Sequence, residues 1–516
     1  MYVPSLRTLI FSSLLALAAC EGCKSTNPPN VAADSPVAPP TLRLYLVSDL
    51  AGALEPCGCV KDQLGGLDRF LAFEDAEAKR GIASAMVAAG PLFFMDATLA
   101  EDRRAQELTK AETLADGLRK ANLLAFAPAA NDHALGDPTL AELAKRSGGA
   151  ALAGESRVVV REVGGIKIGL IGIDPQHSGE AERVARAGYE EAKAQGARVF
   201  VVLASIGRGA AKRVADAVPE LTAVLVGSPS GGGDTNTETP PGERLGNVLI
   251  AETGNHLQTV SILDLTVRAD GSTFADASNL DDKKTRRELD EKLKKLRTKI
   301  AVASAGTQTG DDGQNAELAT LRAAREKLDF GPTPKEGNYA RYRILEVRES
   351  LGKADFAVQL FRAYYKKVND SNKVAFADRK PRPPAAGEAS YVGQDACVDC
   401  HEAPKKVWDK TAHAHAYATL SDQFKEFNLD CVSCHVTGYD KPGGSTVTAV
   451  KGLTDVQCEV CHGPGSKHAK DPKLAMPIPR PGAEACLGCH HPPHVHTFDA
   501  ALKMNEILGP GHGRPL

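Results

Sequence analysis

Aromatic side chains, charge of one sign and long apolar runs are all scarce in this sequence. Phe, Tyr and Trp make up 5% of the 516 residues, and Trp408 is the one tryptophan. The formal net charge of −3 indicates neither a nucleic-acid surface nor a large charged docking face. After residue 20, no apolar run is long enough to cross a membrane. The composition is that of an ordinary globular chain with room for two to four domains.

Cysteine, by contrast, is concentrated near the C-terminus. Eight of the 12 cysteines lie in four copies of one pattern, CVDCH at 397–401, CVSCH at 431–435, CEVCH at 458–462 and CLGCH at 486–490. C-x-x-C-H is the attachment signature of c-type haem, in which two thiols bond to the porphyrin and the histidine binds the iron. The pattern predicts four covalently bound haem c groups. Their attachment residues are Cys397, Cys400, Cys431, Cys434, Cys458, Cys461, Cys486 and Cys489, and their proximal ligands are His401, His435, His462 and His490.

Two structural zinc sites are the alternative use of the same cysteines. Each site would take four cysteine ligands. That alternative leaves unexplained why a histidine follows every pair, so haem attachment is the stronger interpretation.

The N-terminus predicts export. Arg7 is followed by an apolar run over residues 9–19, which is too short to span a bilayer and is typical of a signal-peptide core. The run ends in LAAC at 17–20, which resembles the bacterial lipobox. That resemblance implies a signal peptide of residues 1–20, cleaved before Cys20, and a lipid on the Cys20 thiol, with an ordinary secretory signal as the alternative. We expect a membrane-anchored lipoprotein on the periplasmic side, with the proline-rich residues 21–40 as a disordered spacer.

Residues 41–270 alternate between apolar runs and helical stretches. The apolar runs are 42–49, 84–90, 123–129, 167–173, 197–205, 223–228, 247–253 and 256–267, and the clearest helices cover 103–120 and 179–195. Short apolar runs separated by helices predict an α/β layered domain.

The ends of these runs carry a resemblance. DLAG, AGP, ANDH, VLASIG and VLVGSPS resemble the metal-binding loops of the metallophosphatase (calcineurin-like) domain of the 5′-nucleotidase family. The resemblance implies a four-layer β-sandwich flanked by helices, in which such loops hold two divalent metal ions. Asp49 matches the first aspartate and Asn131 the asparagine, while Asp132 and His133 follow in shifted order. Other ligand positions hold Ala51, Pro91, Ser205, Ser228 and Ser230. We therefore expect a degenerate domain that keeps the fold and has no dinuclear metal centre.

A C-x-C pair, Cys57 and Cys59, follows the first apolar run. Because α/β sheets bind ligands at the carboxyl ends of their strands, we expect this pair at the mouth of the former metal site. Three interpretations are open, namely a structural disulfide with a partner such as Cys23, a redox-active or substrate-binding thiol pair, and a copper or zinc site. Cys57 and Cys59 are the candidate catalytic residues.

The middle of the chain changes in character. Residues 281–330 are rich in Lys, Arg, Glu and Leu at helical spacing and predict a helical hairpin with a turn at 306–314. Its charges indicate a solvated face, with a partner-docking arm as the alternative. Residues 339–372 predict a strand-and-helix connector, and the proline-rich residues 376–390 predict a linker into the haem domain.

Residues 391–516 offer little sequence for a core beside four porphyrins. We expect a mostly α, loop-rich tetrahaem cytochrome c domain of short helices whose core is the haems. Eleven of the 14 histidines lie here, four of them proximal. The other seven are His413, His415, His468, His491, His494, His496 and His512. They can supply up to four distal ligands, and at least three bind no iron.

This region resembles a known cytochrome family. YVGQDACVDCH, VWDKTAHAHAYATL, CVSCHVTGYD, VQCEVCHGPGSKHA and ILGPGHG are similar to the tetrahaem cytochrome c family of ammonia oxidisers, which accepts electrons from hydroxylamine oxidoreductase. The resemblance implies that His413, His468 and His512 are distal ligands, so that three haems have two axial histidines each. The haem on Cys431 is then either open at iron or completed by His494 or His496.

These patterns predict an exported, lipid-anchored multihaem c-type cytochrome that transfers electrons to or from a redox protein. One alternative is an oxidoreductase acting on a small nitrogen or sulfur compound, at Cys57 and Cys59 or at an open haem. The other is a residual 5′-nucleotidase-type phosphohydrolase fused to a cytochrome.

Overall fold

The computed structural model describes residues 39–56, 63–231, 235–280, 283–303, 312–328, 330–491, 494–495 and 498–515. The described residues from Pro40 onward belong to one compact unit. The predicted signal peptide with Cys20, the residues Cys23, Cys57 and Cys59, and His496 lie outside the described residues. Among the helices that the structure describes, none has the length and apolar character needed to cross a membrane.

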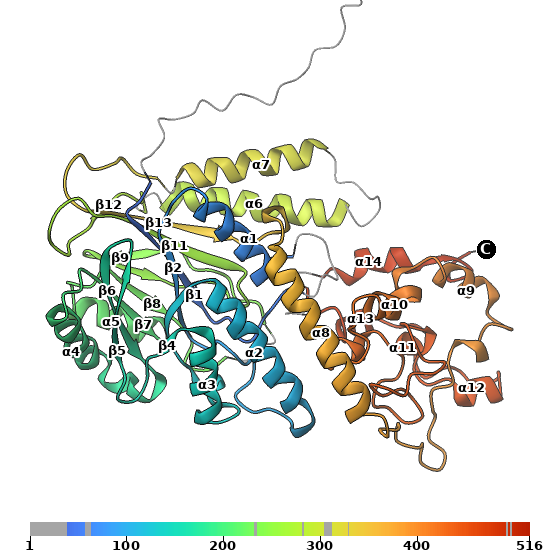
Figure 1. Cartoon of the computed structure of the whole chain (residues 1–516). Helices are drawn as coiled ribbons and strands as arrows, with labels where there is room; N and C mark the ends of the chain where they lie inside the picture. Colours follow the sequence, from blue (N-terminus) through green and yellow to red (C-terminus); the bar gives the residue numbers. More distant parts are fainter. Residues whose placement is uncertain are drawn as a thin grey trace, which may run out of the picture. The chain divides into compact units, whose positions relative to one another are not determined.

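Two β-sheets form the centre of the N-terminal part (Figure 1). The first has seven strands in the order β12-β13-β11-β1-β2-β3-β4, and the second has six in the order β5-β6-β7-β8-β10-β9. The strands of the first are β1 Leu42–Ser48, β2 Ser84–Ala89, β3 Leu123–Ala127, β4 Ala150–Ala151, β11 Thr259–Thr266, β12 Ala275–Asp276 and β13 Tyr339–Glu346. Those of the second are β5 Val158–Val163, β6 Ile166–Ile173, β7 Val199–Ala204, β8 Ala223–Val226, β9 Glu243–Leu245 and β10 Val248–Ala251. Strands β1, β2 and β3 run parallel, as do β6, β7, β8 and β10.

The sheets pack face to face because both sides of their strands are apolar. In β1, Leu42, Leu44 and Leu46 point into the core between the sheets, and the alternate residues Tyr45 and Val47 point toward helices. The helices on the first sheet are α1 Leu67–Ala78, α2 Arg104–Lys120, α3 Asp137–Ser147 and α8 Asp355–Ala375, and those on the second are α4 Ala181–Ala194 and α5 Arg208–Ala217. Helix, sheet, sheet and helix give the four layers that the sequence predicted, so this part of the fold class is confirmed.

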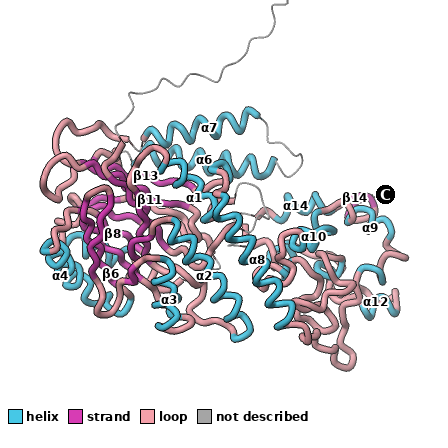
Figure 2. Tube along the Cα trace, in the orientation of Figure 1, coloured by secondary structure: helices cyan, strands magenta, loops and turns pink. Residues whose placement is uncertain are grey.

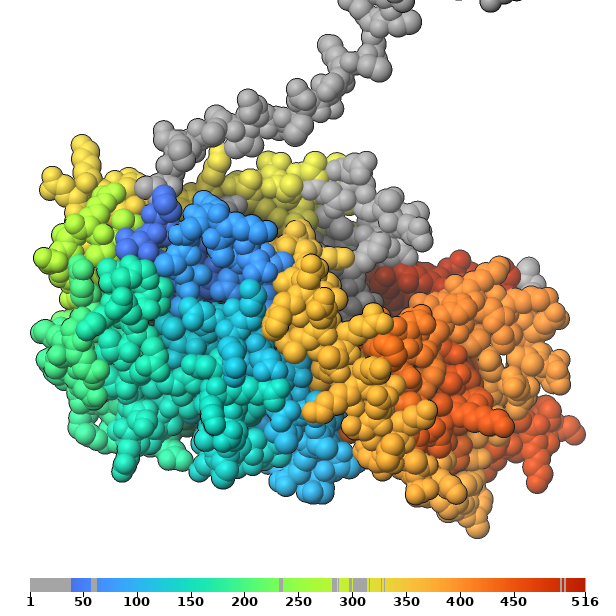
Figure 3. Space-filling view, in the orientation of Figure 1, coloured from blue at the N-terminus to red at the C-terminus, as the bar shows by residue number. Residues whose placement is uncertain are grey.

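The segment predicted as a strand-and-helix connector, 339–372, contains a strand, β13, and most of a helix, α8, and both are part of the α/β layers. Strand β13 pairs with β11 from Tyr339 to Glu346, and buried Phe361 and Tyr364 of α8 pack into the helix-side core. Figure 3 shows α8 beside α2 on the surface of the same layer. The apolar pattern predicted a strand and a helix but not the elements that they contact. Because of those contacts, the segment belongs to the α/β layers.

Two helices lie in the segment where the hairpin was expected, α6 Lys283–Ala303 and α7 Asp312–Lys327. They pack on each other through Leu293, Leu296 and Leu318. Helix α7 begins at Asp312, inside the predicted turn.

The C-terminal region is built from short helices and loops (Figure 2). Its helices and strands are α9 Glu402–Trp408, α10 Ala416–Ser421, α11 Cys458–His462, α12 Ser466–Lys470, α13 Ala483–Leu487, α14 Ala500–Ile507, β14 Gly509–Pro510 and β15 Gly513–Arg514. The short 3-10 helices of the chain are η1 Glu101–Arg103, η2 Ala130–His133, η3 Pro175–Glu180, η4 Glu349–Leu351, η5 Gln394–Ala396, η6 Ala412–His415 and η7 Val432–Cys434. The predicted mostly α, loop-rich region is confirmed.

The segment predicted as a linker, 376–390, packs against its neighbours. Phe376 belongs to a small apolar cluster with Leu429, Val432, Val436 and Val447. The guanidinium of Arg379 pairs with Asp102 at 2.9 Å and with Asp440 at 2.8 Å. The prolines of this segment therefore shape an extended path along the surface and do not separate two independent bodies.

Candidate functional site

Each C-x-x-C-H segment forms a tight turn. The backbone N–H of His401 donates to the carbonyl of Cys397 at 3.0 Å, and that of His490 donates to Cys486 at 2.9 Å. The third copy is itself the helix α11, and the second contains η7. Residues three apart on a helical turn lie on one side of it, which brings the two thiols of each copy together beside the histidine.

Three of the motif histidines lie opposite a second histidine. The ring centres of His401 and His468 are 6.1 Å apart. Those of His413 and His490 are 6.2 Å apart. Those of His462 and His512 are 6.4 Å apart.

This spacing is the one that a shared metal ion requires. A metal–nitrogen bond of roughly 2 Å puts an imidazole centre roughly 3 Å from the metal, so two axial rings have centres roughly 6 Å apart. The structure thus brings each of the three distal histidines that the family resemblance implied opposite a different C-x-x-C-H histidine.

The same histidines are oriented through their second ring nitrogen. Nδ1 lies 3.0 Å from the carbonyl of Ile478 in His462, 2.5 Å from that of Leu474 in His468, and 2.8 Å from that of Ile507 in His512. A carbonyl partner places the ring proton on Nδ1 and leaves Nε2 with a lone pair for a metal. Burial lowers the pKa of His413, His462 and His490, which favours the neutral form that binds metals.

His435, the histidine of the second motif, differs from the other three. Its Nδ1 lies 2.6 Å from the carbonyl of Ala416, so Nε2 is again left for a metal. Within the described part of the chain, no second histidine ring stands opposite it at the spacing of the three pairs.

The remaining surplus histidines are placed in two ways. His415 directs Nε2 to the carbonyl of Asp409 at 3.2 Å, so that nitrogen is already engaged. The rings of His491 and His494 are 5.3 Å apart, and the carbonyl of His494 accepts from Gln63 of the α/β layers.

The four motifs are close to one another. Interaction with the Cys397 thiol lowers the pKa of Cys458 to about 7. Interaction with the Cys489 thiol likewise lowers the pKa of Cys434 to about 6. Helices α11 and α13, which carry the third and fourth motifs, also touch. Neighbouring motifs therefore follow the order first, third, fourth, second. The cysteines, histidines and their spacing fit covalently bound haem c.

The second motif faces the α/β layers. Asp430, directly before Cys431, accepts from Arg103 and from Lys110 of α2, the latter at 3.1 Å. The buried amide of Gln106 in α2 accepts from the backbone N–H of Leu429 at 2.9 Å. Burial raises the pKa of an acid, but Lys110 and Arg103 hold the pKa of Asp430 below its usual value. Burial also raises the pKa of the Cys431 thiol to about 12.

At the ends of β1 and β8, polar groups bind one another. The partly buried carboxylate of Asp49 accepts from the Ser228 backbone N–H at 2.9 Å and from its hydroxyl at 2.7 Å. Burial raises the pKa of Asp49 to about 6, and the two bonds from Ser228 oppose that rise. A Cβ on Gly90 would lie 1.8 Å from the same carboxylate, so only glycine fits beside it.

The other polar groups of these loops are engaged in the same way. The amide of Asn131 donates to the carbonyl of Met95 at 2.6 Å and to that of Gly231 at 2.9 Å. The carboxylate of Asp132 accepts hydrogen bonds from three backbone N–H groups. The hydroxyl of Ser205 accepts from the N–H of Gly90 and donates to the carbonyl of Ala127. His133 points elsewhere, toward Asp137 at 2.5 Å on the surface. Hydrogen bonds between loops occupy the positions where metal ligation would need free oxygens, so these residues do not fit a dinuclear metal centre.

The flanks of the C-x-C segment contact the C-terminal region. Before it, Glu55 accepts from Lys425 at 2.8 Å and from the hydroxyl of Tyr365 at 2.9 Å. After it, the side chain of Gln63 donates to the carbonyl of His494. Cys57 and Cys59 themselves lie outside the described residues, so their predicted roles stay predictions.

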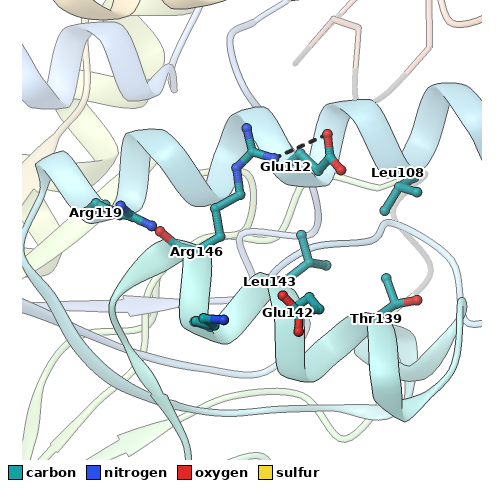
Figure 4. A pocket seen from close by; sticks show the side chains of 8 residues that line it. Leu108, Glu112, Arg119, Thr139, Glu142, Leu143 and Arg146 are labelled. Atoms are coloured by element: carbon teal, nitrogen blue, oxygen red, sulfur yellow. Dashed lines mark hydrogen bonds and ion pairs between the residues drawn. The ribbon is translucent and has the colours of Figure 1, made fainter.

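A surface pocket of about 420 Å³ lies between α2 and α3 (Figure 4). Its lining includes Glu112 and Arg146, whose charges pair at 3.3 Å, and Arg146 also binds Asp116 at 2.7 Å. The charge of Arg146 is thus paired, and none of the described residues that the sequence singled out lines the pocket.

Sequence reasoning missed one residue. His256 was placed in an apolar run over 256–267, but β11 begins at Thr259. His256 lies in the preceding loop, 8% exposed, and neither ring nitrogen has a hydrogen-bond partner among the described residues. The available signal was its rarity, because only three histidines precede the haem region.

Comparison with known proteins shows that part of the C-terminal region matches a cytochrome family. Residues 396–463 match the family model described as cytochrome c554 and c-prime. The chain is also 37% identical, over 102 residues, to cytochrome c-554 of Nitrosomonas europaea, a match that covers 17% of this chain and 43% of that protein. The chain thus spans less than half the length of this relative. The predicted resemblance of the C-terminal part to this cytochrome family is confirmed.

Solved structures similar to the chain include two from Thermus thermophilus. One is a 5′-nucleotidase precursor, with 16% identity, a TM-score of 0.40 and coverage of 74% of this chain and 67% of that chain. The other is the sulfate thiohydrolase SoxB, with 14% identity, a TM-score of 0.40 and coverage of 65% and 62%. At such identities the likeness concerns the fold alone.

Proposed function

We propose that the chain is an electron-transfer protein whose C-terminal region carries four haem c groups. The observation that carries this proposal is the set of three histidine pairs with ring centres 6.1, 6.2 and 6.4 Å apart, each pair containing one C-x-x-C-H histidine. Haem c, when bound, exchanges one electron at each iron. Two axial imidazoles give low-spin iron suited to electron transfer.

The protein's own residues hold and orient these groups. The paired thiols fix each porphyrin, and Nδ1–carbonyl bonds keep the axial rings neutral and aligned. The order of neighbouring motifs, first, third, fourth, second, supports a continuous electron path. Its last member, the motif at Cys431–His435, lies beside α2, so the path ends at the α/β layers.

We propose further that the chain is exported and anchored by a lipid on Cys20, and that its partner is a redox protein. The sequence of the first twenty residues supports the export, and haem c attachment outside the cytoplasm agrees with it. Mass spectrometry of the mature N-terminus tests the anchor, because an unmodified Cys20 or cleavage at another position excludes it.

The haem number is tested on the purified holoprotein. A pyridine haemochrome assay should give four haems per chain, and denaturation should release none because thioether bonds are covalent. Electron paramagnetic resonance should show at least three low-spin ferric haems. Fewer than three low-spin signals would refute the three axial pairs.

A second candidate is an oxidoreductase acting on a small nitrogen or sulfur compound at the haem of Cys431. It is favoured by one observation, namely that no histidine ring among the described residues lies opposite His435 at the spacing of the other three pairs. A residual phosphohydrolase is disfavoured, because the side-chain oxygens of Asp49 and Asn131 already accept hydrogen bonds from Ser228 and Gly231. Hydrolysis of a nucleotide or phosphodiester by the purified protein with Mn²⁺ would reverse that judgement.

A further inference from the structure

Helix α2 contacts the segment before the second haem motif through ion pairs. The carboxylate of Asp430 lies 3.1 Å from the ammonium of Lys110 and also accepts a hydrogen bond from the guanidinium of Arg103. The carboxylate of Glu107 pairs with the same two cations, with Lys110 at 2.8 Å and with Arg103 at 3.2 Å. The four side chains therefore form one network of two cations and two carboxylates, whose formal charges cancel.

The inner half of this network is shielded from solvent. The side chains of Glu107 and Lys110 are 4% and 11% exposed, and those of Asp430 and Arg103 are 30% and 36% exposed. Burial raises the pKa of Asp430, but Lys110 and Arg103 hold it below its usual value, so the carboxylate is charged at neutral pH. Removing one member of the network therefore leaves a net charge that solvent screens only in part.

The chain itself joins this network to the second motif. Asp430 directly precedes Cys431, and consecutive Cα atoms lie about 3.8 Å apart. Gln106 of α2 fixes the same turn, because its side-chain oxygen accepts from the N–H of Leu429 at 2.9 Å. The Asp430 carboxylate is thus held beside the residue that would form one thioether bond to a haem.

We propose that Arg103 and Lys110 set the reduction potential of the haem at the second motif by cancelling the charge of Asp430. This rests on the proposed haem attachment at that motif. Reduction adds one electron, supplied by the redox partner, to the ferric iron, so the ferrous haem carries one positive charge fewer. A negative charge nearby stabilises the ferric state, and the two cations from α2 oppose that effect. The α/β layers thereby hold an electron more tightly at the end of the haem path that they contact.

The test is a spectroelectrochemical titration of the full-length holoprotein and its variants. Asp430→Asn leaves an excess positive charge, so the equilibrium constant for reduction of this haem should rise about five- to tenfold. Lys110→Met leaves an excess negative charge, so the same constant should fall by a similar factor. A tenfold change corresponds to about 59 mV for one electron. The double variant lacks both charges and should lie near wild type. If Lys110→Met does not fold, Arg103→Gln, at the more exposed cation, should lower the potential in its place.

Two further variants assign and control the shift. His435→Met either raises the potential of its haem or prevents attachment of that haem, and the single wave that changes identifies the second motif. Asp116→Asn is the matched control, because Asp116 also lies on α2 but pairs with Arg146 at 2.7 Å within the α/β layers. It should leave all four potentials unchanged. Haem content and the ferric spectrum should match wild type in Asp430→Asn and Lys110→Met.

Several results would overturn the proposal. Shifts in the same direction in Asp430→Asn and Lys110→Met would show that a structural disturbance, and not charge, controls the potential. Unchanged potentials in both variants would show that the network does not act on the haem. A shift confined to waves other than the one identified by His435→Met would place the effect at another haem. Absence of covalent haem in wild type would instead refute the proposed function itself.

Discussion

At the scale of single residues, the histidines divide by which ring nitrogen the backbone engages. His462, His468 and His512 each direct Nδ1 to a carbonyl, whereas His415 directs Nε2 to one. That difference leaves Nε2 of the first three rings available to a metal and engages Nε2 of His415. His413 and His415 stand two residues apart in one AHAH segment, but only His413 lies opposite a motif histidine.

Substitution of one distal histidine should therefore change one haem. In His468→Ala the haem held by Cys397, Cys400 and His401 loses an axial nitrogen, so one low-spin ferric signal should become high spin while four haems remain attached. Electron paramagnetic resonance and a pyridine haemochrome assay measure the two quantities. His415→Ala is the matched control and should leave the spectrum unchanged. An unchanged spectrum in His468→Ala would show that His468 does not bind iron.

The raised pKa of Asp49 predicts that the stability of the fold depends on pH. Its folded pKa of about 6 lies above the usual value of 3.8, so the folded state holds the proton more tightly than the unfolded state does. Its contribution to stability is full below pH 4 and is lost as the pH rises through about 6. Asp49→Asn removes the partly buried charge, and Asn tolerates the φ of 49°. At pH 7 the variant should be more stable by about 1–3 kcal/mol, and at pH 4 the two proteins should unfold alike.

Chemical denaturation at the two pH values tests the Asp49 prediction. A variant that is destabilised at pH 7 would show that the carboxylate is needed, as it would be for a metal ligand.

At the scale of elements, the apolar runs predicted most strands because buried parallel strands are apolar on both faces. Strands β6, β7 and β8 match the predicted runs to within two residues. The partners of a strand are set by contacts distant in sequence, which is why the strand β13 was predicted but its pairing with β11 was not. Likewise, the sequence held no signal that the 425–430 segment would bind α2, since that contact depends on single polar side chains.

Helix α2 should hold the C-terminal region through Gln106. Its buried amide oxygen accepts from Leu429 N–H at 2.9 Å and from Asn372 at 2.8 Å, and its nitrogen donates to Asn428 at 3.2 Å. Gln106→Ala leaves the N–H of Leu429 buried without a partner and opens a small cavity. We expect a loss of about 2 kcal/mol in the free energy of unfolding.

Trp408 provides the measurement for Gln106→Ala. It is the one tryptophan of the chain, it lies in the C-terminal region, and bound haems would quench its fluorescence until that region unfolds. Gln195→Ala, an exposed glutamine at the end of α4, should change the unfolding midpoint little. Equal midpoints for Gln106→Ala and Gln195→Ala would show that α2 does not stabilise the C-terminal region.

At the scale of the whole molecule, the α/β layers and the C-terminal region differ in how much apolar side chain their cores contain. The α/β layers contain three large clusters of buried apolar side chains, while the C-terminal region has a small one around Leu429, Val432, Val436 and Val447. The C-terminal region also leaves Leu474, Ile478 and Leu487 exposed in the protein alone. Porphyrins bound at the four motifs would supply the missing apolar contacts.

Removing the haems should then unfold one part and spare the other. A variant with alanine at all eight motif cysteines lacks covalent attachment, so the region after residue 391 should lose its packed structure. The α/β layers should persist, because their cores contain no haem-binding residue. Limited trypsin digestion should therefore leave a resistant fragment that ends near Arg379–Arg382, while wild-type holoprotein resists cleavage throughout. Equal resistance of the C-terminal region in both proteins would show that it folds without haem. Equal sensitivity of both regions in the variant would show that the α/β layers depend on the contacts of Gln106 and Lys110 with residues 428–430.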